Sequence, residues 1–310
     1  LAAGSNNGGV SAYAVDYQTG SLVPLADSPL AAGKNPVTLV AAPNGLSLYV
    51  VNHDDSTVMQ FSIGTDGKLY LKNTVNITGS FPTAAAIDTA GKFLYVTFTY
   101  QLGPGGQQLY SPASPGPGGI TIFPINADGS LGTASTQVVG NNPVAIAITP
   151  VTSSAPSYVY VVDQEAIPNA TVLGFAQNAS TGALTPTPGT VITTVAGKTV
   201  ATGYSAGVTT SAIAADASSR FIYVTDQATN QIFGNGIGAG GTLVPMNTGP
   251  VPTGQLPVAV TVDPRAKFMY VANNTSGSVS AYALDQASGA PVAVSLSSST
   301  TVGPRPNCVA

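Results

Sequence analysis

The chain has 310 residues, a length that suits one large domain or two small ones. Only 7% of the residues are charged, whereas 44% are hydrophobic, and the net charge is −4. This composition excludes a charge-rich disordered chain and a coiled coil, and it offers no excess of cations to neutralise the phosphates of nucleic acid. No apolar run approaches the roughly 18 residues that a membrane span needs, so we expect no membrane-spanning segment.

The chain consists of a repeat with four short predicted strands. A strand of small apolar residues comes first, as in NPVTLVAAP from Asn35, and a second strand ends in Tyr-Val. A third strand carries an aromatic residue near its middle, and a glycine turn leads to a fourth. The Tyr-Val pairs stand at Tyr49-Val50, Tyr95-Val96, Tyr160-Val161, Tyr223-Val224 and Tyr270-Val271.

Four strands separated by turn residues and repeated every 46 to 65 positions predict the blades of an all-β propeller. The first strands read as continuous small apolar runs, which is typical of strands buried on both faces between blades. Two insertions lengthen the spacing, at Gln101–Pro117 and at Thr185–Gly207. The predicted complete blades span residues 33–77, 81–140, 141–200, 205–252 and 255–302, within a single domain from 1 to 310.

The two ends of the chain predict one further, divided blade. The first 22 residues align without a gap on the segment from Tyr270, and the tail 306–310 matches the opening of a first strand. We therefore expect six blades, with seven as the alternative, and one of them combines 306–310 with 1–30. About eight residues of that blade have no counterpart. Either both termini close it, or a neighbouring subunit supplies a strand and links copies into an oligomer or filament.

The turns after the second strands and those before the first strands lie on one face of a propeller, so they converge on the mouth of its channel. Loops on a rigid scaffold commonly carry binding sites. We therefore expect ligand contacts from these residues: Asn52, His53, Asp163, Glu165, Asp226 and Asn273.

Three kinds of chemistry are candidates at this mouth. His53 can act as a general base oriented by Asp54, with a plain polar turn as the alternative. Arg305 is the candidate cation for a developing oxyanion. Carboxylates at Asp163, Glu165 and Asp226 are candidate calcium ligands, with solvated turn acids as the alternative, and we expect no other cofactor.

The recurring pattern P-x-x-[VA]-x-[VI]-[DT]-P followed by [KR]-F-[LIM]-Y-V-[AVT]-[ND] resembles the YVTN-repeat propellers and the wider lactonase-like propeller family. The resemblance covers nearly the whole chain. It implies a propeller fold and leaves two functions open. The first is a non-enzymatic binding or structural module, which the scarcity of charged and histidine side chains favours. The second is a hydrolase that opens a sugar lactone at the channel mouth. Lactonases of this family typically have seven blades, against the six counted.

Composition and the first residue bear on where in the cell the protein acts. Sparse charge with abundant Ser, Thr, Asn and Gly is typical of exported proteins, and a start at Leu1 rather than Met indicates a removed leader or a late start. We expect an extracellular or cell-surface protein. Five Asn-x-Ser/Thr sequons are candidate glycosylation sites: Asn76, Asn169, Asn178, Asn273 and Asn274.

Overall fold

The computed structural model describes residues 8–101, 117–153, 155–164, 170–195, 198–294, 299–302 and 305–308. These residues form β-strands and turns, with one short 3₁₀ segment, η2 (Ala239–Gly241). No helix within these ranges is long and apolar enough to cross a membrane. The chain divides into two compact units, Leu1–Val138 and Val139–Ala310, and the division falls within strand β12 (Ser135–Gly140).

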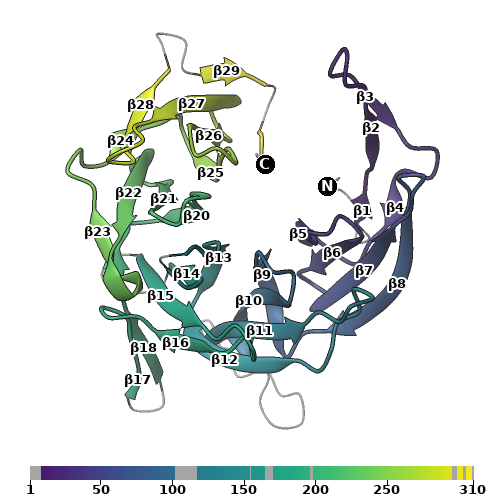
Figure 1. The fold of residues 1–310 in the computed structure, drawn as a ribbon, viewed down its shortest axis with the longest axis horizontal. Coiled ribbons are helices and arrows are strands. Elements are labelled where there is room, and N and C mark those ends of the chain that lie inside the picture. The colour runs from purple at the N-terminus through teal and green to yellow at the C-terminus, as the bar shows by residue number, and fades with distance from the viewer. Residues whose placement is uncertain are drawn as a thin grey trace. The chain divides into compact units, whose positions relative to one another are not determined.

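Two four-stranded sheets of the first unit follow chain order, β5 to β8 and β9 to β12 (Figure 1). In both sheets the first three strands pair antiparallel. Their bounds are β5 (Pro36–Ala41), β6 (Ser47–Asn52), β7 (Thr57–Ile63), β8 (Leu69–Asn76), β9 (Gly79–Ile87), β10 (Phe93–Gln101) and β11 (Gly118–Pro124).

The second unit holds three sheets of the same order, each with a fifth short strand that returns to pair with the third. The first sheet comprises β13 (Pro143–Ile148), β14 (Tyr158–Asp163), β15 (Thr171–Gln177), β16 (Leu184–Pro186) and β19 (Tyr204–Ser205). The second comprises β20 (Thr210–Ala215), β21 (Phe221–Asp226), β22 (Gln231–Ile237), β23 (Leu243–Pro245) and β24 (Val251–Pro252). The third comprises β25 (Pro257–Val262), β26 (Phe268–Asn273), β27 (Ser278–Leu284), β28 (Pro291–Ala293) and β29 (Ser299–Thr301).

These five sheets confirm the predicted four-stranded blades, and every Tyr-Val pair lies in a second strand. The boundaries shift slightly. β9 begins at Gly79, ahead of the predicted start at 81, and β19 pairs with β15 of the preceding blade. Part of the insertion after Thr185 forms a separate hairpin of β17 (Val191–Val195) and β18 (Lys198–Thr202). The other insertion, Gln101–Pro117, lies mostly outside the described residues.

The second strands hold much of the buried core, because a strand flanks them on either side within the sheet. All six residues of β14 are buried, and so are those of β6. In β21, Ile222 and Val224 join one apolar cluster with β14, whereas Tyr223 joins another with β26. This alternation follows from the two-residue period of a strand. The first strands β5, β20 and β25 are only partly buried, so the expectation that first strands are buried on both faces does not hold for them.

A tyrosine hydroxyl links consecutive blades within each unit. The Tyr49 hydroxyl donates to the carbonyl of Gly129 at 2.6 Å, Tyr160 donates to Gly241 at 3.0 Å, and Tyr223 donates to Gly289 at 2.7 Å. Each accepting glycine lies in the turn between the third and fourth strands of the next blade. Burial raises the pKa of the Tyr160 and Tyr223 hydroxyls far above the ordinary value, so both stay neutral donors.

The strands near the N-terminus form two small pairs. β1 (Gly9–Val10) pairs with β4 (Leu30–Ala31), and β2 (Tyr13–Val15) pairs with β3 (Leu22–Pro24). These pairs occupy the segment 1–30 that the sequence assigns to the divided blade.

The tail departs from the prediction of a first strand. The described part, Arg305–Cys308, is not a strand, and the Pro306 carbonyl accepts its hydrogen bond from the Asn274 side chain. It does share one feature with the first-strand openings. Arg305 has φ +55° directly before a proline, as Asn35 does at +51° and Leu256 at +54°.

Candidate functional site

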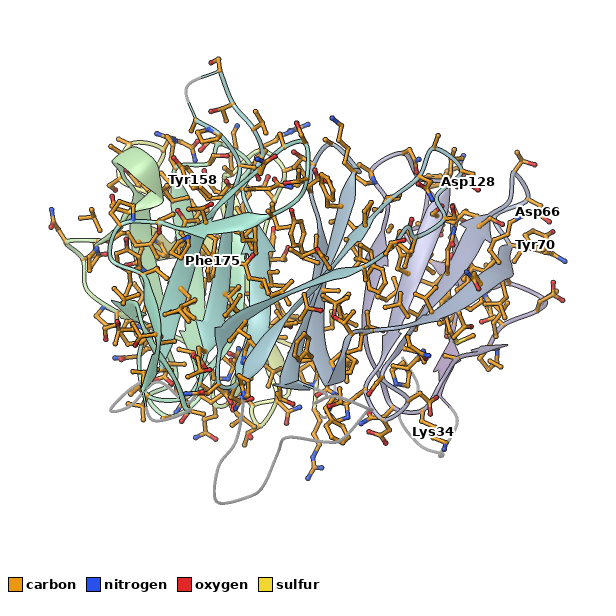
Figure 2. All side chains as sticks on the ribbon, turned by 90° about the horizontal axis from the view of Figure 1, so that it is seen from below. Lys34, Asp66, Tyr70, Asp128, Tyr158 and Phe175 are labelled. Carbon is orange, nitrogen blue, oxygen red and sulfur yellow. The ribbon has the colours of Figure 1, made fainter. Side chains whose placement is uncertain are left out.

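The loops before the first strands and the turns after the second strands meet at one end of each blade. In the first unit, Lys34 marks this end, and the turns carrying Asp66 and Asp128 lie at the opposite end of the strands (Figure 2). The backbone N–H of His53 donates to the carbonyl of Asn35 at 2.9 Å. Gln164 and Asn274, at the same position in two other blades, donate to Asn142 and Leu256. The repeat thus places these residues at the same end of each blade, and their convergence on a channel mouth stays a prediction.

Four of the predicted mouth residues end a second strand, and all four are fully buried: Asn52, Asp163, Asp226 and Asn273. The Asp163 carboxylate accepts the backbone N–H groups of Asn141 at 3.0 Å and Asn142 at 2.8 Å. Asp226 accepts those of Val208 and Thr209 at 3.2 and 2.6 Å, and also the Thr229 hydroxyl. Each carboxylate therefore ties the loop before the first strand to the end of the second.

The two asparagines make comparable links. The Asn52 side-chain oxygen accepts the N–H of Gly33 at 3.1 Å, and its amide nitrogen donates to the Thr57 hydroxyl at 3.1 Å. The Asn273 oxygen accepts the Thr253 hydroxyl at 3.0 Å. Such bonds satisfy buried polar groups, whose isolation would be costly. We call these four residues the blade clamps.

The calcium hypothesis remains a prediction. The oxygens of Asp163 and Asp226 accept hydrogen bonds from their own loops, and Glu165 lies outside the described residues. Among the described residues, no group of three or more His, Cys, Asp or Glu side chains is placed to hold a metal ion.

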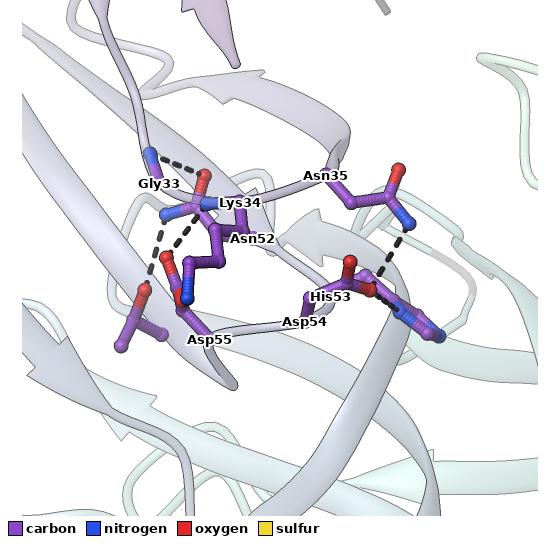
Figure 3. Close-up of polar contacts among 8 residues, drawn as sticks. Gly33, Lys34, Asn35, Asn52, His53, Asp54 and Asp55 are labelled. Atoms are coloured by element: carbon purple, nitrogen blue, oxygen red, sulfur yellow. Dashed lines mark hydrogen bonds and ion pairs between the residues drawn. The ribbon is translucent and has the colours of Figure 1, made fainter. Parts of the chain in front are cut away.

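His53 and Asp54 form a hydrogen-bonded pair in the turn after β6 (Figure 3). His53 Nδ1 lies 2.7 Å from Asp54 Oδ1, and the same oxygen accepts the Asn35 amide N–H at 3.2 Å. Adjacent residues of a strand point to opposite faces, but these two follow the strand in a turn, which lets their side chains meet. The neighbouring Asp55 points the other way, toward Lys34, whose backbone N–H it accepts at 2.6 Å (Figure 3).

The electrostatics of the pair suit a general base. Hydrogen bonds from His53 and then Asn35 hold the pKa of the Asp54 carboxyl below its usual value, so Asp54 is ionised at neutral pH. An ionised Asp54 selects the imidazole tautomer with hydrogen on Nδ1. The lone pair then lies on Nε2, which has no hydrogen-bond partner among the described residues. His53 is about one-third exposed, so water can reach it.

The other candidate residues, Arg305 and the asparagines of the sequons, belong to other segments of the chain. Arg305 is exposed in the segment after β29. Among the sequons, Asn76 and Asn178 are exposed, Asn274 donates to the Asn307 side chain at 2.6 Å, and Asn273 is buried as a clamp. Asn169 lies outside the described residues.

Two residues from the turns before the first strands, where the sequence analysis looked for mouth residues, contribute to the His53 surroundings: Asn35 and Phe81. Both directly precede a proline and have left-handed backbone, with φ +51° and +53°. The Xaa-Pro dipeptide before each first strand was the available signal, but its side-chain contacts depend on the fold.

Comparison with known proteins identifies the class. The family described as "Lactonase, 7-bladed beta-propeller" matches residues 2–145 and 151–310. The chain therefore belongs to the seven-bladed lactonase β-propeller family. This assignment confirms the resemblance and the all-β propeller class. It also favours seven blades, the alternative to the six counted from the strand pattern.

Solved structures show the same fold. A protein from Lactobacillus plantarum matches with a TM-score of 0.72 and 19% identity over 99% of this chain and 82% of that one. A functionally unknown protein from Desulfotomaculum acetoxidans matches at 0.63 and 17%, over 85% and 70%. The Pseudomonas aeruginosa periplasmic gluconolactonase matches at 0.52 and 20%, over 97% and 94%. A search of curated protein sequences finds no match.

Proposed function

We propose that this chain is an exported hydrolase that opens a small, uncharged sugar lactone, with His53 as the general base. The observation that carries the proposal is the 2.7 Å bond between His53 Nδ1 and the ionised Asp54. Membership of the lactonase family supports it, as does the likeness to a protein described as a periplasmic gluconolactonase. An uncharged substrate agrees with the small number of cations, 9 Lys and Arg in 310 residues.

The proposed reaction is addition of water to the lactone carbonyl. Nε2 of His53 accepts a proton from the water as its oxygen attacks the carbonyl carbon, and Asp54 stabilises the imidazolium that forms. The tetrahedral intermediate collapses by breaking the ring carbon–oxygen bond. The imidazolium returns its proton to the departing ring oxygen. One water is consumed, and the product is the open hydroxy acid.

A non-enzymatic binding module is the second candidate, and one observation favours it. The blade clamps Asn52, Asp163, Asp226 and Asn273 use their side chains to tie together the loops and strand ends of their own blades. Four of the six predicted mouth residues therefore serve structure, which leaves fewer groups for catalysis. In this reading the His53 turn contributes to recognition of a ligand and no bond is broken.

Proton release from gluconolactone, above its spontaneous hydrolysis, tests the two functions directly. We expect His53→Gln and Asp54→Asn each to lower kcat by about 10² or more, since general bases contribute 10² to 10⁴. Asp55→Asn is the matched control, because it removes a carboxylate from the same turn that points away from His53. Its kcat should match that of the wild type.

The pattern of results separates the candidates. Turnover by the wild type and by Asp55→Asn, with loss in the other two variants, supports the hydrolase. Turnover that survives His53→Gln contradicts the assigned base. No turnover above background, together with saturable binding of the lactone by calorimetry, supports the binding module.

A further inference from the structure

The backbone at Phe81 is held in a conformation that L-amino acids seldom adopt. Phe81 has φ +53°, and its N–H donates to the Ser56 hydroxyl at 3.2 Å, in the turn between the second and third strands of the preceding blade. Left-handed backbone is costly for non-glycine residues and persists only where surrounding contacts enforce it. The hydrogen bond to the Ser56 hydroxyl is one such contact. The conformation determines where the Phe81 ring lies.

The repeat contains a twin of this arrangement. Leu256 has φ +54° before Pro257, and its N–H donates to the Asn230 side chain at 2.8 Å. Asn230 occupies the same turn position as Ser56, with the same left-handed backbone. The two sites therefore share a backbone and differ in the side chain. The twin shows that a leucine fits this backbone.

The Phe81 ring packs against the imidazole of His53. Their ring centroids lie 5.3 Å apart, with planes tilted by 39°, which is within the range of favourable aromatic pairs. The residues at the His53 position in two other blades make a different kind of contact. Gln164 donates its side-chain amide to the carbonyl of Thr210 at 2.5 Å, and Asn274 donates to that of Pro306 at 3.3 Å. Those side chains bond the backbone that follows, whereas His53 meets a ring.

We propose that Phe81 is a positioning residue, whose strained backbone holds a ring against His53 and thereby keeps the Nδ1–Asp54 bond intact and Nε2 open. Two contacts then restrain the imidazole, the Phe81 ring beside it and Asp54 at Nδ1. Rotation about the side-chain torsions would break both. The inference rests on the proposed function, because it assigns Phe81 a role in the work of the same base.

Phe81→Leu is the decisive variant, and Phe81→Tyr is its conservative control. The chain has a single histidine, so ¹⁵N NMR of the imidazole reads His53 without assignment ambiguity. In the wild type and in Phe81→Tyr, we expect the tautomer with hydrogen on Nδ1. In Phe81→Leu, we expect a mixture of tautomers. We also expect kcat on gluconolactone to fall about 3- to 10-fold in Phe81→Leu, with an altered pH profile, and to recover in Phe81→Tyr.

The NMR and the kinetic measurements can contradict the positioning role and the proposed function separately. An unchanged His53 tautomer in Phe81→Leu overturns the positioning role, whatever the rate of the wild type. If the wild type shows no turnover, the proposed function fails, and the NMR arm still decides whether Phe81 orients His53. An altered tautomer with unchanged kcat also overturns the positioning role, because the orientation would not matter to the reaction.

Discussion

Aspartates in this chain act mainly through hydrogen bonds to nearby N–H groups. Asp163 and Asp226 accept from the loops of their own blades, and Asp54 accepts from His53 and Asn35. Asp216 and Asp263 close the turns between first and second strands by accepting backbone N–H groups four and five residues ahead. The type of residue at each turn was visible in the repeat. The acceptor it provides depends on which N–H groups the fold brings within about 3 Å.

Asp285 offers a test of this role through pH. Hydrogen bonds from the Ser288 N–H, the Ser288 side chain and the Ala287 N–H lower the pKa of the Asp285 carboxyl from its ordinary value of 3.8. A pKa lowered by folding adds stability above the unfolded pKa, and this stability is lost as pH falls through the folded pKa. We therefore expect the urea midpoint of Asp285→Asn to depend less on pH than that of the wild type between about pH 5 and 2.

The pH dependence of stability can be tested independently at Asp16. It aligns with Asp285, and hydrogen bonds from Gln18 and Thr19 lower its pKa in the same direction. Asp16→Asn should flatten the acid limb of the stability curve in the same way. Parallel curves for both variants and the wild type would contradict the assignment.

At the level of single strands, the Tyr-Val repeat is explained by how the second strands pack. β21 is covered on both faces, so its residues alternate between the preceding and the following blade. The tyrosine of Tyr-Val adds a hydroxyl that reaches a glycine carbonyl in the next blade. A phenylalanine would fill the same space without the bond, which accounts for tyrosine at this position in the three linked strands.

Tyr160→Phe isolates that bond. The change leaves the buried carbonyl of Gly241 without its donor, and such a loss typically costs about 1 to 3 kcal/mol in the free energy of unfolding. Tyr17→Phe is the matched control, because Tyr17 is 97% exposed and should change the free energy by less than about 0.5 kcal/mol. Urea denaturation of both variants measures the difference. Equal midpoints would show that the bond adds nothing.

For the whole molecule, self-association through the divided blade stays a prediction. The exposures of aligned residues motivate it, since Tyr13 in β2 is 50% exposed and Tyr282 in β27 only 2%. An apolar hairpin edge of this kind is suited to pairing with an added strand. Light scattering of the purified chain is the measurement, and masses at multiples of 30.8 kDa are expected. A homogeneous monomer at all concentrations would exclude strand exchange between copies.

The sequence by itself determined the four-stranded repeat, the place of each Tyr-Val strand and the family. These features arise from local β-propensity, turn glycines and burial on both faces, which leave a pattern in neighbouring residues. Only the tertiary structure decided that Asn52, Asp163, Asp226 and Asn273 are clamps, that His53 bonds Asp54 and contacts the Phe81 ring, and that the described tail is not a strand. The physical reason is that hydrogen bonds and ring contacts depend on side-chain direction in turns and on segments remote in sequence, which no local pattern encodes.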